Sequence, residues 1–295
     1  MRVNPNPYPD LLNSVALTQQ QIQTDEQEIA SGQSVTEPAD NPAAAAQLVQ
    51  NASQTSAADQ YERSIGSIQG EIQNADSALS SVISSLRQAI SLGVEGANST
   101  VNPADRQAIA TQVTGIQSQL LSLANLSYQG NYVFAGTATQ AAPYVLDVNS
   151  PSGVTYAGNT GTNSVTLGDN FKLQTNLPGS KLFSASGTDM FQSIQDLITG
   201  LQTGVGIETA VTELGNASAS IDTQRVFYDN ALNQLNSQQT YLSGATTQLA
   251  QEQNTLGGAD LTVVISNLTT AQTSVQATLE AIGQTAHVDL FDYLK

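Results

Sequence analysis

The chain has 295 residues, no cysteine and a formal net charge of -17 at pH 7. Hydrophobic residues make up 39% of it and charged residues 11%, both below the usual shares in globular domains. The eight Lys and Arg residues are scattered, so the chain lacks the basic cluster needed to bind nucleic acid or an anionic membrane. The composition therefore favours long, thin helical bundles over a thick globular core, held without disulfides.

The first predicted element is a helix over residues 11–30, preceded by a proline-rich lead. Large apolar residues recur there at every seventh position, at Val15, Ile22 and Ile29, a spacing typical of coiled-coil seams. The lead lacks the apolar core and cleavage site of a secretory signal peptide. We therefore expect that, if the protein leaves the cell, it does so without a cleaved signal.

A helical hairpin is predicted next. Asn41-Pro42 and Asn102-Pro103 each place a capping residue before a proline at the first helical position. A 4-3 apolar spacing continues from Ile65 to about residue 126 and is interrupted by a short polar turn near residue 98. Because the turn is short, the two helices should lie antiparallel.

Period-two alternation then replaces the helical pattern. Four short segments, beginning at Tyr144, Val154, Val165 and Phe171, alternate apolar and polar residues and are separated by Asn, Gly and Pro. This pattern predicts a small antiparallel meander.

Helical periodicity resumes near Met190 and predicts a long helix. Leu214 opens a strict series of large residues seven apart that ends at Leu256. After Gly257-Gly258, a last helix is expected over residues 260–284. Its 4-3 seam consists of Leu261, Ile265, Leu268, Val275, Leu279 and Ile282.

These elements predict a mainly α fold, a long helical bundle or coiled coil made from both chain ends, with a small antiparallel β domain inserted in the middle. The predicted domains are a terminal helical domain (1–42 and 257–295), a helical rod (43–136 and 190–256) and a β domain (137–189). Few large apolar residues support either end, so we expect the terminal domain to be disordered in the monomer and to order when chains pack together. Its apolar seams are the candidate assembly and chaperone interface.

The sequence offers few candidate catalytic residues. His287 is the only histidine, which rules out a two-histidine metal helix and leaves a Ser-His-Asp triad one terminal candidate. No phosphate-binding glycine motif follows a strand. We therefore expect no enzyme activity, no metal and no cofactor.

Several motifs resemble the flagellin family of bacterial flagellar proteins, and within it the proteins of the hook–filament junction. The segments that carry this resemblance are Met1 to Val3, Ile29 to Ala45, Tyr128 to Thr137 with Pro143-Tyr144, and Asp260 to Leu294. Gln33 and Ser34 stand where the family usually has basic residues. The likeness is weak between residues 137 and 190.

The resemblance implies an extracellular structural subunit, exported unfolded through the flagellar channel and polymerised through its terminal helices at the hook–filament junction. The partners it implies are hook-associated protein 1, flagellin, an export chaperone and further copies of the same chain.

Three alternatives remain open. They are filament flagellin itself, an unrelated helical scaffold, and an enzyme housed in the β insert.

Overall fold

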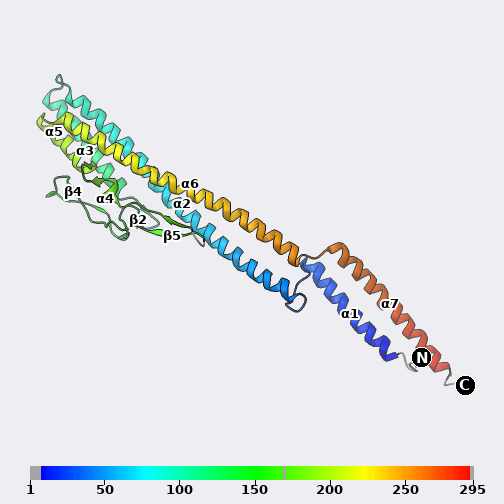
Figure 1. Cartoon of the computed structure of the whole chain (residues 1–295). Coiled ribbons are helices and arrows are strands. Elements are labelled where there is room, and N and C mark those ends of the chain that lie inside the picture. The colour runs from blue at the N-terminus through cyan, green and yellow to red at the C-terminus, as the bar shows by residue number, and fades with distance from the viewer. Residues whose placement is uncertain (1–7, 169–170, 293–295) are drawn as a thin grey trace. The chain divides into compact units, whose positions relative to one another are not determined.

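The computed structural model describes the backbone of residues 8–168 and 171–292 and the side chains of residues 9–168 and 171–284. By its internal contacts the chain divides into two compact units. The terminal unit comprises Met1–Ala57 and Gly244–Lys295, and the middle unit comprises Ala58–Ser243. Each unit is described separately below, and both take residues from helices α2 (Pro42–Ala97) and α6 (Ile207–Gly257) (Figure 1).

In the terminal unit, helix α1 (Tyr8–Ser31) packs against helix α7 (Leu261–Asp292). An antiparallel bridge between Gln33 and Gly258 joins the segments that follow α1 and precede α7. The Ser34 N–H donates to the Gly257 carbonyl at 2.7 Å, and the Ala259 N–H donates to the Gly32 carbonyl at 3.0 Å. The end of α1 is therefore held beside the start of α7, and the two helices run antiparallel from there.

In the middle unit, α2 and α6 are accompanied by α3 (Pro103–Ala124) and α5 (Met190–Thr203), which pack on each other. As the sequence predicts, Asn102 caps α3, accepting the Asp105 N–H at 2.9 Å. The predicted long helix beginning near Met190 is interrupted, because Gly204 and Gly206 both adopt positive φ angles of 79°. These residues turn the chain between α5 and α6, and glycine adopts this conformation without steric cost.

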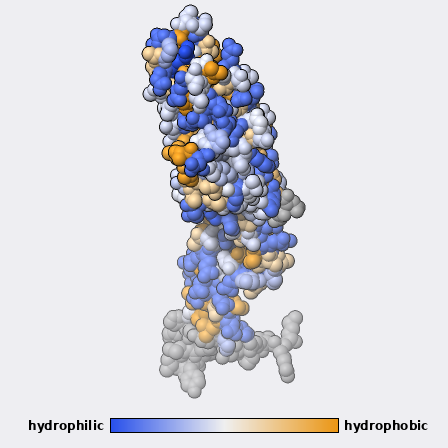
Figure 2. All heavy atoms as spheres, turned by 90° about the vertical axis from the view of Figure 1, so that its left-hand side faces the viewer, coloured by the Kyte–Doolittle hydropathy of each residue, from blue (hydrophilic) through white to orange (hydrophobic). Residues whose placement is uncertain are grey.

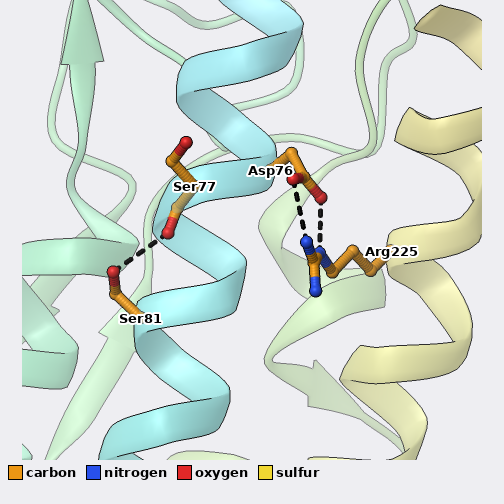
Figure 3. A network of polar contacts seen from close by, with 4 residues as sticks. All are labelled: Asp76, Ser77, Ser81 and Arg225. Carbon is orange, nitrogen blue, oxygen red and sulfur yellow. Dashed lines mark hydrogen bonds and ion pairs between the residues drawn. The ribbon is translucent and has the colours of Figure 1, made fainter.

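The seam of α6 is buried in the middle unit. Leu214, Ile221, Tyr228, Leu235 and Leu242 are all buried, whereas Leu249 and Leu256, in the terminal unit, are half-buried. A paired contact also joins α2 to α6, since the Arg225 guanidinium donates two hydrogen bonds to the Asp76 carboxylate (Figure 3).

Within the described residues, the β region consists of four separate antiparallel hairpins and not one meander. Their strands are β1 (Ser127–Tyr128) with β2 (Asn131–Tyr132), β3 (Tyr144–Leu146) with β4 (Val154–Tyr156), β5 (Ser164–Thr166) with β6 (Lys172–Gln174), and β7 (Ser184–Ala185) with β8 (Thr188–Asp189). A short helix, α4 (Gly179–Leu182), precedes β7. Strands of two or three residues form few backbone hydrogen bonds. Side-chain packing therefore contributes to holding the hairpins in place.

Those side chains form an aromatic cluster. Phe134, Tyr144, Phe183 and Phe191 are buried, and their rings meet at centroid distances of 4.9–5.9 Å. Phe191 belongs to α5 and Tyr144 to β3, so the cluster attaches the β3–β4 hairpin to the helices. The predicted fold class, mainly α with a small β domain, is confirmed.

Candidate assembly surface

Helix α1 presents a narrow seam with a 4-3 spacing. Its members are all buried or half-buried, namely Leu11, Val15, Thr18, Ile22, Asp25 and Ile29. The three residues singled out from the sequence, Val15, Ile22 and Ile29, all belong to this seam. Val15 is buried and the other two are half-buried.

Helix α7 has a seam of the same kind. Its buried or half-buried members are Val264, Leu268, Ala271, Val275, Thr278 and Ile282. Of the residues expected from the sequence, it includes Leu268, Val275 and Ile282. Val264 and Ala271, its two most buried members, were not anticipated, although the 4-3 spacing also fits them.

The other three expected residues of α7 lie outside this seam. Leu261, Ile265 and Leu279 are 45%, 51% and 51% exposed. At about 100° of rotation per residue, they lie about 60–100° around the helix from the centre of the seam. We call these three residues the outer stripe. The apolar face of α7 is therefore wider than the part that a single helix covers.

A groove lies at the end of the unit where α1 and α7 are joined. It has a volume of ≈ 630 Å³ and is lined by the link after α1, the first turns of α2 and the last turns of α6. Val35, Leu48 and Val49 give it apolar walls, and Gln253 and Asn254 give it polar ones. Val49 is exposed, so this groove adds a second incompletely covered apolar surface to the terminal unit.

The charges of the terminal unit are almost all negative. No Lys or Arg occurs between residues 3 and 62 or between residues 226 and 294. Burial, together with the nearby Asp25 and Asp40 carboxylates, raises the pKa of Glu28. No basic side chain of the described part of this unit is available to offset these acids.

The face shown in Figure 2 is mostly hydrophilic, with a few separate hydrophobic patches.

Within the described residues, no group of three or more His, Asp or Glu side chains is arranged to hold a metal ion. None of the described helices combines the length and apolarity needed to cross a membrane. The side chain of His287 lies outside the described part of the chain.

Comparison with known proteins agrees with the sequence motifs. Residues 6–139 match the family described as the bacterial flagellin N-terminal helical region. The resemblance to the flagellin family is confirmed.

Two curated relatives of this flagellin-like chain are flagellar hook-associated protein 3 of Escherichia coli and of Salmonella typhimurium. The first is 27% identical over 210 residues, covering 66% of this chain and 64% of the relative. The second is 34% identical over 119 residues, covering 40% and 38%. The matched part thus spans less than two thirds of either relative.

The fold is shared with a solved structure. The crystal structure of Bacillus cereus FlgL aligns with a TM-score of 0.60 at 21% identity, over 70% of this chain and 99% of that one. At this level of identity the likeness establishes the fold alone.

Proposed function

We propose that this chain is a structural subunit of the bacterial flagellum, which joins the hook to the flagellin filament and polymerises through its terminal unit. The observation that carries the proposal is the width of the apolar face on α7. Helix α1 covers Val264 and Ala271, while Leu261, Ile265 and Leu279 stay half-exposed. Neighbouring copies would cover this outer stripe, because burying apolar surface is the main driving force for association.

The partners follow from the similarity to hook-associated protein 3. They are hook-associated protein 1 on the hook side, flagellin on the filament side, identical subunits in a ring and an export chaperone. The protein would act outside the cell at the hook–filament junction, after export from the cell. It would work as a structural part and not as an enzyme.

The nine residues chosen from the sequence take two roles in this proposal. Val15, Ile22, Ile29, Leu268, Val275 and Ile282 hold the α1–α7 pair together, and the outer stripe contacts neighbouring copies or the chaperone. A deletion strain tests the function. We expect hooks to remain, filaments to be absent and flagellin to be shed into the medium. Normal flagella in that strain would refute the proposal.

Point variants in the same strain test the surface. Ile265→Asp combined with Leu279→Asp should leave the middle unit folded yet fail to restore filaments. Val226→Asp is the matched control, since Val226 is also half-exposed but lies in the middle unit. If the double variant restored filaments fully, the outer stripe would not be part of the assembly surface.

The leading alternative is filament flagellin itself, because the matched N-terminal region is a flagellin region. Long filaments formed by the purified protein alone would favour that alternative. Failure to polymerise without partners would favour the junction role.

A further inference from the structure

One seam position of α1 is occupied by a carboxylate. Asp25 stands where the 4-3 spacing calls for an apolar residue, between Ile22 and Ile29, and it is only 2% exposed. A polar residue at a core position of a coiled coil lowers the stability of the pairing that buries it.

The hydrogen bonds of Asp25 are incomplete. The Gln21 Nε2 amide, one turn earlier, donates to Asp25 Oδ1 at 2.8 Å. Asp25 Oδ2 is buried and accepts no hydrogen bond among the described residues. A buried charged oxygen without a partner loses its hydration and gains nothing in return.

The surroundings do not compensate for this charge. The charged groups that interact with this turn of α1 are acidic, since Asp25 and Asp40 both raise the pKa of Glu28, after the larger effect of burial. The sequence has no Lys or Arg from residue 3 to residue 62, or in α7. A buried charge that lacks an opposite charge destabilises the folded form in which it is buried.

We propose that Asp25 acts as a built-in restraint on closure, which keeps α1 from pairing stably with α7 of the same chain. Closing the pair buries the Asp25 carboxylate, and opening it returns Oδ2 to water. The open state therefore gains population relative to a chain with an apolar residue at this position. If the chain has the proposed function, on which this consequence rests, α1 and α7 stay accessible to neighbouring copies until assembly.

Amide hydrogen exchange on the full, monomeric chain tests the restraint. Asp25→Leu restores an apolar seam and should slow exchange in α1 and α7 about ten-fold or more, equivalent to about 1.4 kcal/mol in the opening equilibrium. Asp25→Asn removes the charge but keeps the shape, and it should slow exchange by a smaller factor. Peptides from the middle unit serve as an internal reference and should not change.

The matched control is Glu26→Leu, which introduces the same side chain at the neighbouring, exposed position. It should leave exchange within about two-fold of the unmodified chain. Unchanged or faster exchange in the ends of both Asp25 variants would overturn the proposal. Because this measurement involves no assembly, its outcome is independent of whether the chain is a flagellar junction subunit.

Discussion

The side-chain amide of Asn125 takes the place of a neighbouring strand along β3 at Tyr144. Its Nδ2 donates to the Tyr144 carbonyl at 2.7 Å, and its Oδ1 accepts the Tyr144 N–H at 2.9 Å. Tyr144 pairs with β4 on its other side and is 2% exposed, within the aromatic cluster. Asn125 thus closes one edge of a very short hairpin and joins it to the end of α3.

Removing this amide should destabilise the middle unit. Asn125→Ala leaves both backbone groups of a buried residue without their partner, so we expect the free energy of unfolding to fall by about 1–3 kcal/mol. Urea denaturation monitored by circular dichroism measures this change. Asn233→Ala, at an exposed position of α6, is the control and should change stability by less than about 0.5 kcal/mol. Equal stability of the two variants would mean that water replaces the Asn125 amide without loss.

The Asp76–Arg225 pair should contribute modestly to the packing of α2 on α6. The two side chains are 19% and 30% exposed, so solvent screens their attraction. A double-mutant cycle with Asp76→Ala and Arg225→Ala should give a coupling free energy of about 0.5–1 kcal/mol, decreasing in 1 M salt. A coupling that does not change with salt would show that side-chain packing, and not charge, holds this contact.

The link after α1 should loosen in acid. The Asp40 carboxylate accepts the N–H groups of Glu37 and Thr36 and the Thr36 hydroxyl, at 2.8, 3.0 and 3.2 Å. These hydrogen bonds, first that of Glu37, lower the pKa of Asp40. The stabilisation is therefore fully present above the unfolded pKa of about 3.9 and is lost as the pH falls through the lower folded value.

Nuclear magnetic resonance can follow this titration through the amide shifts of Thr36 and Glu37. Both should move together between about pH 5 and pH 2, because acid-sensitive hydrogen bonds of a carboxylate are lost in that range. In Asp40→Asn the Thr36 amide shift should stay flat. Identical titration of the two proteins would exclude Asp40 as the group responsible.

Limited proteolysis should trim the isolated chain to its middle. Few apolar side chains support α1 and α7, and the α1 seam contains Asp25. We therefore expect thermolysin to remove both ends and leave a stable fragment near residues 45–255, with fragment masses read by mass spectrometry. Resistant ends in a proven monomer would contradict the expected disorder, and Asp25→Leu should slow the trimming.

Much of the fold could be predicted because helix periodicity is a local property of the chain. The α6 series from Leu214 to Leu242 is buried as its spacing indicates, and the Asn102 cap forms as its Asn-Pro signature suggests. The strands of the hairpins β3–β4 and β5–β6 begin within one residue of the predicted segments. Their separation into independent pairs was not predictable, since alternation identifies a strand but not its neighbour.

On the candidate assembly surface, too, the sequence pattern identifies an apolar face but not the neighbour that covers it. In α7, Leu261 and Ile265 attract attention by size, whereas the residues that meet α1 are Val264 and Ala271, at a different angle around the helix. The spacing of the sequence fits both sets equally well. In the sequence, Asp25 interrupts the 4-3 apolar spacing of α1. That interruption does not show that one oxygen of the carboxylate is buried without a hydrogen-bond partner.

By itself, the sequence determined that this protein is built from long helices, that both ends have coiled-coil seams, and that few candidate catalytic residues are present. Only the tertiary structure decided which side of α7 faces α1 and which stays exposed. It also paired Asp76 with Arg225, 149 positions away, and placed Asn125 against Tyr144. The physical reason is that periodicity specifies the apolar face of one helix, whereas the part of that face that becomes buried depends on the partner that packs against it.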